Sequence, residues 1–304
     1  MSRSSISRPL CDQIQLKENA NDLQAIPSGA GAKNLQPTEP MVYFTNWLVN
    51  FMPRAPGRPD PQPDRSAETR TRILDAALRE FSAKGLAGAR TEQIASAAGV
   101  NKALLYYHFE SKEKLYLAAL DMVSLRVRDR SMAILLRDAS PGERLLRAAL
   151  DHFDRILTQR EFQSMMQQEM MRQQKGEKGA LPILIARVFA PLTATFESIV
   201  REGAASGELV DVDWMAMLLA ALGANVFYFL SAPVWRLATP GFEPFDFETL
   251  RRRRIALVEF LGQAIFINRR HGEELTRRVL ADTPMPAGEA IKPVQLPRIE
   301  VKKR

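Results

Sequence analysis

One short segment, residues 91–112, constrains the fold of this 304-residue chain more than any other stretch. Its sequence, TEQIASAAGVNKALLYYHFESK, indicates two short helices joined by a tight turn at Gly99. Glycine adopts a left-handed backbone without a Cβ clash, so it can end the first helix. Asn101 has a short side chain that can accept free backbone N–H groups, so the second helix is predicted to begin at Lys102. A turn of this kind sets two helices at a steep angle.

The residue types in this segment separate into a small core and an outward face. The predicted core residues are Ile94, Ala95, Ala98, Val100, Leu105 and Phe109. Lysine, tyrosine and histidine side chains of the second helix are predicted to face outward. Such a helix can protrude into a DNA major groove. Thr91 stands at the start of the first helix, in a position similar to that of Asn101 at the second. The N-terminus of each helix can therefore present backbone N–H groups to a phosphate.

A wider set of residues has the spacing of a known DNA-reading domain. It comprises Arg72 to Ala77, Phe81, Gly85, Thr91, Ile94, Ala95, Ala98, Gly99, Val100, Leu105 to Phe109, Lys112 and Leu115. On these residues the chain resembles the TetR family of bacterial transcription regulators. Asn101 replaces the serine usual in that family, and Ala103-Leu104 is more apolar than the typical small polar pair. These departures affect the expected base preference and leave the expected fold unchanged.

Side-chain chemistry and the resemblance together predict a set of DNA contacts. Lys102 can pair with guanine acceptors or a phosphate, while Ala103 and Leu104 can touch a thymine methyl group. Tyrosine, histidine and lysine can bind phosphate oxygens and fix the register of the protein on DNA. The resemblance implies DNA contacts at Thr91, Lys102, Tyr106, Tyr107, His108 and Lys112. The full predicted set is Thr91, Asn101, Lys102, Ala103, Leu104, Tyr106, Tyr107, His108 and Lys112.

Two residues of this set have an alternative interpretation. Tyr106 can instead belong mostly to the core. His108 can in principle bind a metal or act as a base, but no second ligand stands at helical spacing from it. The sequence predicts no catalytic residue, no metal site and no cofactor, because it contains no nucleophile–base pairing, glycine-rich phosphate loop or His/Cys cluster.

Composition agrees with a bacterial DNA-binding protein of the cytoplasm. The net charge of +7 and the pI of about 9.7 favour a polyanionic partner. Cys11 is the single cysteine, which excludes an internal disulfide framework and fits a reducing compartment. Residues 214–232 and 41–52 are apolar, but we interpret the first as a buried helix interrupted by Asn225 and the second as too short to span a bilayer. Residues 1–40 lack the apolar region of a secretory signal.

The chain is predicted to be all-α and to divide into four parts. Residues 1–64 are expected to form a disordered arm, and residues 1–51 an overextended gene start before Met52. Residues 65–120 are expected to form the helix-turn-helix domain, 121–282 a helical ligand-binding and dimerisation domain, and 283–304 a disordered basic tail. Period-3.6 patterning predicts helices over 66–84, 91–98, 102–108, from 111 onward, and over 141–158, 161–174, 181–205, 211–231 and 248–268. Pro191 is expected to kink its helix.

The larger domain carries a sensing hypothesis. The helix over 161–174 is rich in methionine, whose flexible side chain adapts to apolar ligands. The predicted pocket residues are Phe153, Met165, Met166, Met170, Phe189, Phe227 and Tyr228, with His152, Gln167 and Asn225 to orient the ligand. The alternative is that these residues only fill the core. The methionine-rich helix and the run from Asn225 to Pro233 resemble the CecR-type subgroup. The TetR resemblance implies that a ligand in this domain lowers operator affinity.

The last two predicted helices are expected to form a dimer interface. A symmetric pair of reading helices doubles the contacts across a palindromic site. Residues 217–224 are small enough for close approach, and the second helix shows a broad apolar face. Its members are Ile255, Leu257, Val258, Leu261, Ile265 and Phe266. A four-helix bundle between two copies follows, unless both helices belong only to the core of one chain.

Two functional classes fit this sequence. The favoured one is a homodimeric repressor that a small apolar ligand releases from a palindromic operator, as the resemblance implies. The alternative is a ligand-independent architectural or division-control protein with the same reading head. An accessible pocket near Met165 to Met171 would favour the first class. Arg251 to Arg254 surround their helix, because successive residues advance by about 100 degrees, and so are expected to be solvated or paired with acids.

Overall fold

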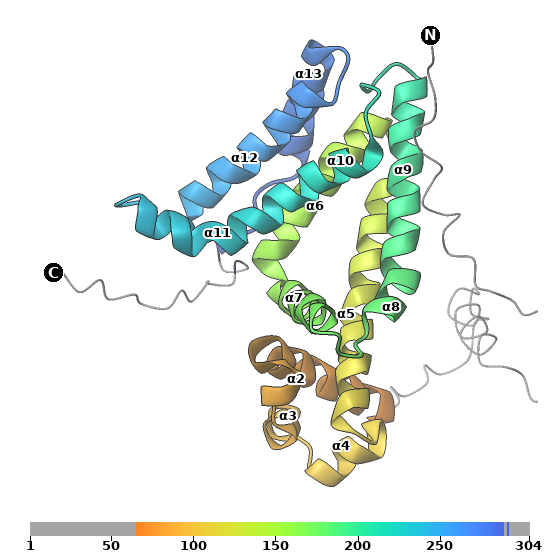
Figure 1. Ribbon diagram of the computed structural model, residues 1–304, viewed down its shortest axis with the longest axis vertical. Helices are drawn as coiled ribbons and strands as arrows, with labels where there is room; N and C mark the ends of the chain where they lie inside the picture. Colours follow the sequence, from red (N-terminus) through yellow and green to blue (C-terminus); the bar gives the residue numbers. More distant parts are fainter. Residues whose placement is uncertain (1–64, 289–290, 292–304) are drawn as a thin grey trace, which may run out of the picture. The chain divides into compact units, whose positions relative to one another are not determined.

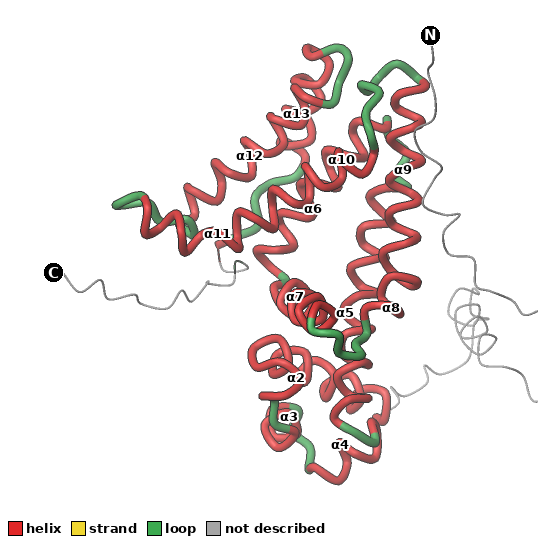
Figure 2. The backbone as a smooth tube through the Cα atoms, in the orientation of Figure 1, coloured by secondary structure: helices red, strands yellow, loops and turns green. Residues whose placement is uncertain are grey.

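The computed structural model describes residues 65–288 and residue 291 (Figure 1). The predicted N-terminal arm, the alternative start at Met52, the apolar stretch 41–52 and most of the basic tail lie outside the described residues. Within them the secondary structure is helical, with a single isolated bridge between Leu209 and Phe266 and no strand (Figure 2). The predicted all-α class is therefore confirmed.

The first helices follow the predicted boundaries closely. They are α2 (Arg65–Gly88), α3 (Thr91–Ala97), α4 (Lys102–Phe109) and α5 (Lys112–Leu135). Gly99 has a φ of 65° in the turn after α3, as predicted. The Asn101 Oδ1 accepts the Leu104 N–H at 2.8 Å and caps α4, also as predicted. α5 is a single helix of 24 residues that packs on α2, α6 and α9.

The core of these first helices extends beyond them in the sequence. Ile73, Phe81, Leu105 and Leu115 are fully buried in it. Phe162, Met165 and Met166 of α7 (Arg160–Gln174) and Leu184 of α8 (Leu181–Leu184) belong to the same buried cluster. α7 packs directly on α2, so it completes the core that the helix-turn-helix segment begins.

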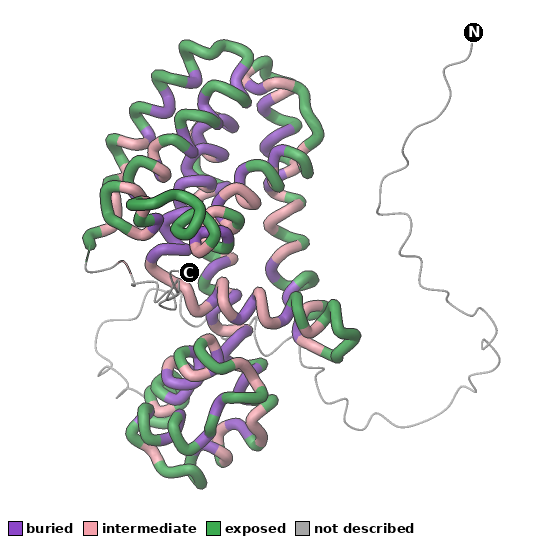
Figure 3. Tube along the Cα trace, turned by 60° about the vertical axis from the view of Figure 1, so that its left-hand side comes forward, coloured by how far each residue is buried: buried purple, intermediate pink, exposed green. Residues whose placement is uncertain are grey.

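The remaining helices surround α6 (Pro141–Thr158), which packs on α5, α9, α12 and α13. They are η2 (Ile185–Phe189), α9 (Ala190–Ala205), α10 (Trp214–Leu218), η3 (Leu219–Gly223), α11 (Ala224–Ala238), α12 (Phe247–Ala264) and α13 (Arg269–Asp282). A second buried cluster lies among them and includes Leu146, Phe153, Leu209 and Val258. Figure 3 shows buried residues on the inward sides of these helices.

Several helix predictions need correction. The predicted helix 181–205 contains the five-residue π-helical segment η2 just before Pro191. Proline has no backbone N–H, so the regular α-helical hydrogen bonds are interrupted at this point. The predicted helix 211–231 begins at Trp214 and continues through Pro233 to Ala238. α13 was not predicted, although Asn268 accepts the His271 N–H at its start and Leu275 and Val279 are buried on one face.

The predicted burial of residues 214–232 is wrong for the single chain. Leu181–Ala205 and Trp214–Ala238 are long and apolar enough to cross a membrane by length and composition, yet only 28% of the most apolar window of each is buried. Leu219, Phe227 and Leu230 are each more than 60% exposed. The segment Trp214–Ala238 therefore has an apolar face that the described residues leave uncovered.

The prediction that this apolar face of α12 is available for a dimer interface is also wrong. Leu257, Val258, Leu261, Ile265 and Phe266 are buried in the core of their own chain, and Ile255 is half-buried. The apolar residues that remain exposed on or just after α12 are Phe247, Ala256, Phe260, Ala264 and Ile267. α12 is apolar on two faces, so periodicity alone could not distinguish the face that meets α6.

Candidate nucleic-acid interface

The α3–α4 pair exposes one side of α4 because its core is small. Ile94, Ala95, Leu105 and Phe109 are buried between these helices and α2. Lys102, Ala103 and Leu104 are exposed along the first turn of α4. Tyr107 is 80% exposed, which is unusual for a large aromatic side chain in a helix. The predicted outward face is thus presented to the surroundings.

Thr91 has a different place from the one its position suggests. It is the first residue of α3, and the N-cap residue is Arg90, whose side chain makes no capping bond. The Thr91 side chain is buried, and its Oγ1 lies 3.3 Å from the Tyr106 hydroxyl. Thr91 therefore ties α3 to α4 instead of capping α3. Tyr106 is half-buried at this contact, so its core role and its predicted phosphate contact are compatible.

Lys102 forms an ion pair with Glu92 of α3. The hydrogen bond between the two side chains lowers the pKa of Glu92 and raises the pKa of Lys102. Both groups are therefore charged at neutral pH. Both side chains are more than half exposed, and exposed pairs of this kind contribute little stability. A phosphate or a guanine could draw Lys102 away from Glu92 at small cost.

His108 and Lys112 lie on either side of the turn after α4. The His108 ring is half-buried and meets the Tyr107 ring edge-on, with 5.5 Å between the ring centres. Lys112 is the first residue of α5, and its Nζ donates to the Ala87 carbonyl at 3.2 Å. The described part of the chain has no cluster of His, Cys, Asp and Glu that could hold a metal ion.

The residues predicted to line a ligand pocket lie in several environments. Phe153 is fully buried in the cluster around α6, whereas Met165 and Met166 are buried in the cluster that α7 shares with α2. Phe189 is half-buried against the cluster that α7 shares with α2. Met170 and Phe227 are exposed. Tyr228 is half-buried, and its hydroxyl donates to the Pro244 carbonyl at 2.6 Å.

A buried polar pair lies within the larger cluster. The Asn225 Nδ2 is 3.3 Å from the Ala149 carbonyl oxygen and 3.3 Å from the His152 Nδ1. Burial, and then the charge of Arg155, lowers the pKa of His152 to about 3, so its ring is neutral at neutral pH. The Asn225 Oδ1 is buried and has no hydrogen-bond partner among the described residues.

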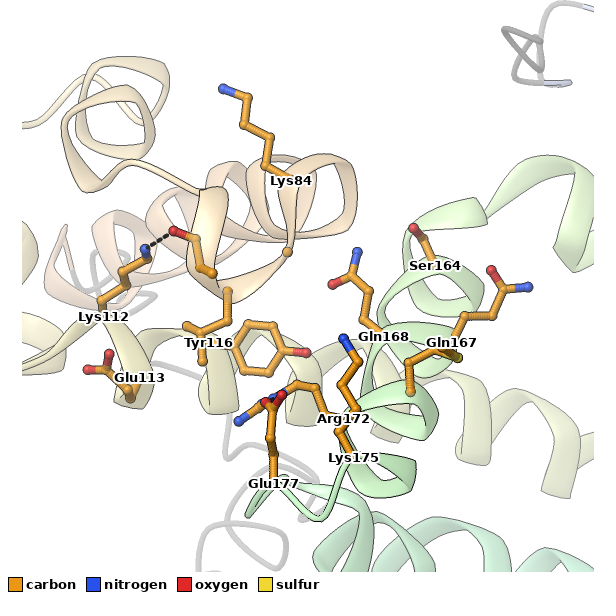
Figure 4. A pocket seen from close by; sticks show the side chains of 14 residues that line it. Lys84, Lys112, Glu113, Tyr116, Ser164, Gln167, Gln168, Arg172, Lys175 and Glu177 are labelled. Atoms are coloured by element: carbon orange, nitrogen blue, oxygen red, sulfur yellow. Dashed lines mark hydrogen bonds and ion pairs between the residues drawn. The ribbon is translucent and has the colours of Figure 1, made fainter. Parts of the chain in front are cut away.

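The residue-by-residue sequence predictions missed a cleft between α2, α5 and α7 (Figure 4). Its volume is about 640 Å³, and Lys84, Lys112, Gln167 and Lys175 are among the residues that line it. Gln167 is the only predicted ligand-orienting residue in this cleft. The cleft lies beside residues 165–171, where the sequence hypothesis places an accessible pocket, and Met171 lines it. Its other walls, residues 84–87 and 112–116, are far apart in the sequence, so no local pattern could have indicated them.

The arrangement of α2, α3 and α4, followed by a larger helical region, defines a helix-turn-helix protein. Residues 73–119 match the family described as bacterial regulatory proteins, tetR family. These residues form a helix-turn-helix domain of the TetR family. The family and its curated members matched below are transcriptional regulators and not enzymes.

Comparison with individual relatives covers different parts of the chain. The chain is 32% identical over 105 residues to the HTH-type transcriptional repressor NicS of Pseudomonas putida, a match that covers 34% of this chain and 50% of NicS. It is 55% identical over 51 residues to the HTH-type transcriptional regulator RutR of Escherichia coli, covering 17% of this chain and 24% of RutR. The matches thus span half or less of these curated relatives. A solved gamma-butyrolactone receptor, described as ArpA-like, is similar in fold, with a TM-score of 0.51 and 21% identity over 72% of this chain and 100% of the receptor.

Proposed function

We propose that this protein is a cytoplasmic, homodimeric transcriptional repressor that a small ligand releases from a palindromic DNA operator. The observation that carries the proposal is the exposed side of α4, where Lys102, Leu104 and Tyr107 lie next to the Asn101 cap. A short capped helix with exposed cationic and aromatic side chains suits a DNA groove. Residues 65–120 would form the DNA-reading domain and residues 121–282 the domain for ligand binding and dimerisation.

The proposed DNA contacts divide into two kinds. Lys102 at the start of α4 would exchange Glu92 for a base edge or a phosphate, and the exposed Ala103 and Leu104 would contact thymine methyl groups. Tyr107, His108 and Lys112 would bind phosphate oxygens, which set the position of α4 without reading sequence. Tyr106 would add a phosphate contact from its hydroxyl, and Asn101 and Thr91 would hold the two helix starts in place.

The proposed dimer would use the exposed apolar residues of η3, α11 and α12. Leu219, Phe227, Leu230 and Val234 follow a helical period along η3 and α11, and each is more than 60% exposed. Phe260 of α12 is exposed to a similar extent. Exposed large apolar side chains at helical spacing favour a protein partner, and two copies would cover them by forming a four-helix bundle.

The proposed effector would bind beside the buried His152–Asn225 pair. Buried polar atoms almost always have a hydrogen-bond partner, and the Asn225 Oδ1 has none among the described residues. The rings of Phe153 and Phe229 lie nearby in the same apolar cluster, with 5.5 Å between their centres. A small apolar molecule with one hydrogen-bond donor could pack against these rings and donate to the Asn225 Oδ1. Its binding would favour a conformation with weaker operator affinity.

The first test is binding of the purified protein to DNA from upstream of its own gene, with footprinting at two salt concentrations. We expect a protected palindrome that persists against competitor DNA. Binding that vanishes with salt and leaves no footprint on this or other genomic fragments would contradict specific repression. It would favour the ligand-independent architectural class.

Substitutions in the reading head test the proposed phosphate contacts. Tyr107→Ala and Lys112→Ala should each weaken operator binding roughly tenfold, and Lys112→Ala should reduce the salt slope by about two, because each dimer loses two phosphate contacts. Lys178→Ala removes an exposed lysine far along the sequence and serves as the control. Circular dichroism should be unchanged in all three variants. Wild-type operator affinity in both head variants would contradict the proposed contacts.

A further inference from the structure

The cleft between the reading head and α7 has the size and walls of a small-molecule site. Its volume of about 640 Å³ lies within the range of about 300–1,000 Å³ that is usual for ligand pockets. The end of α2, from Lys84 to Ala87, forms one wall, the start of α5 a second, and α7 a third (Figure 4). Gly85 has a φ of 69°, which turns the last residues of α2 out of the helix line.

The wall at α7 is fixed by a buried carboxylate. Glu169 is fully buried and accepts hydrogen bonds from the Tyr116 hydroxyl at 2.8 Å and from the Ala180 N–H at 2.6 Å. Arg172 donates to the same carboxylate at 2.8 Å. Burial and the bond to Glu169 raise the pKa of Tyr116, so its hydroxyl keeps the proton that it donates. Tyr116 of α5 and Glu169 of α7 therefore hold two walls of the cleft together.

α7 is also joined to α2 by polar contacts. The Ser164 hydroxyl donates to the Ser82 carbonyl at 2.7 Å. The Gln168 Nε2 donates to the same carbonyl at 3.1 Å. These bonds place α7 directly against the last regular turn of α2. A molecule bound in the cleft would thus touch the reading head and the larger domain at once.

The charged side chains that line the cleft have an excess of cations. Lys84, Lys112, Arg172 and Lys175 face two carboxylates, Glu113 and Glu177. Arg172 pairs with Glu177 and Glu169, and Lys84 pairs with Glu80, which lies outside the lining.

Two of the lining lysines have no acidic partner. Lys112 donates only to the Ala87 carbonyl, and neither it nor Lys175 has a carboxylate partner among the residues that the structure describes. The Gln167 amide also lines the cleft without a hydrogen bond to a described residue. Lys112 and Lys175 come from different walls and leave positive charge unneutralised.

We infer that this cleft binds a small molecule with two or more negative charges, a polycarboxylate or a phosphate compound. Lys112 and Lys175 would each neutralise one anionic group. The Gln167 amide, which lies beyond Lys175 on the side away from Lys112, could donate a further hydrogen bond to a longer ligand (Figure 4). Charge-assisted bonds of this type are stronger than neutral ones. The bound anion would cross-link α5 to the end of α7. This site is separate from the proposed apolar effector site around His152 and Asn225.

The test uses the full-length protein without DNA, so its result does not depend on the proposed DNA binding. Citrate and inorganic pyrophosphate serve as probes for the carboxylate and phosphate classes. Binding of each is measured by isothermal titration calorimetry at constant ionic strength adjusted with sodium chloride. Lys175→Gln removes a cleft cation, while Lys178→Gln removes the same charge from the same connection outside the cleft lining. The thermal midpoint of each variant without probe reports whether it is folded.

We expect saturable binding of one of the two probes, and the probe that binds identifies the class. Lys175→Gln should weaken that binding at least fivefold, and Lys178→Gln should leave it unchanged. Absence of saturable binding by both probes would overturn the inference. Equal weakening by the two variants would also overturn it, because general surface charge would then explain the binding. Unchanged probe binding by Lys175→Gln would overturn it as well, because the probe would then bind elsewhere.

Discussion

The α3–α4 pair and the α11–α12 pair both expose residues at helical spacing, but the chemistry of the two surfaces differs. α4 exposes Lys102 and Tyr107, whereas α11 and α12 expose Phe227, Leu230 and Phe260. Polar and cationic side chains stay hydrated until a polyanion displaces the water, while large apolar surfaces are covered by another apolar surface. The two surfaces therefore suit the two kinds of partner that we propose, a polyanion at α4 and an apolar protein surface at α11 and α12.

The largest expected effect comes from charging the apolar surface. Phe227→Glu combined with Phe260→Glu should convert the dimer to a monomer in sedimentation velocity, because carboxylates would face each other in a buried interface. Operator affinity should then fall on the order of a hundredfold, since two linked heads bind far more tightly than one. Leu136→Glu, at a leucine that is 65% exposed at the end of α5, is the matched control. A double variant that stays dimeric would show that this surface has another role.

A second prediction sharpens the difference between the exposed and buried sides of α12. Arg254 is buried and donates to both oxygens of Asp154, at 2.7 and 2.8 Å. Arg254→Met should lower the free energy of unfolding by about 3–5 kcal/mol, because it leaves a buried carboxylate without its partner. Arg252→Met, on the exposed side, should change it by less than about 0.5 kcal/mol. Equal losses in urea unfolding would contradict this division of the arginine run.

A third prediction concerns pH and the interior of the larger domain. Burial lowers the pKa of His152 to about 3, whereas the unfolded chain binds a proton near pH 6.5. The unfolded state therefore binds more protons between these values, so stability from His152 is complete above pH 6.5 and is lost as pH falls towards 3. The expected loss is about 2 kcal/mol between pH 7 and pH 5. The free energy of unfolding of His152→Gln, measured by chemical unfolding, should lack this part of the pH dependence. If the wild type and the variant lost stability equally between pH 7 and pH 5, the burial argument would be refuted.

The smallest effect is expected at the start of α4. Asn101→Ala removes the capping bond to the Leu104 N–H and should lower stability by about 1 kcal/mol. Asn101→Asp keeps an acceptor at the same place and should retain most of the stability. The two variants are compared by urea unfolding. Equal stability of the alanine and aspartate variants would mean that the cap does not hold α4.

The two regions also differ in how far their structure could be predicted. The end of α3 and the start of α4 follow from Gly99 and Asn101, whose effects act within a few residues of the chain. The exposed face of α12 could not be predicted, because Leu257 and Phe260 are equally apolar and only the position of α6 decides which is buried. The ion pair between Glu92 and Lys102 and the cleft beside α7 depend on distances between elements, which a periodic pattern does not contain.

The core shared by α2 and α7 has a consequence for modularity. Phe162, Met165 and Met166 close the same cluster as Phe81 and Leu105, although they stand outside the predicted reading domain of residues 65–120. A chimera that transplants residues 65–120 alone onto another protein would leave that cluster open to water on one side. To exchange DNA specificity between relatives, α7 would therefore have to be transferred together with residues 65–120, or the recipient would need a helix of matching shape in the same place.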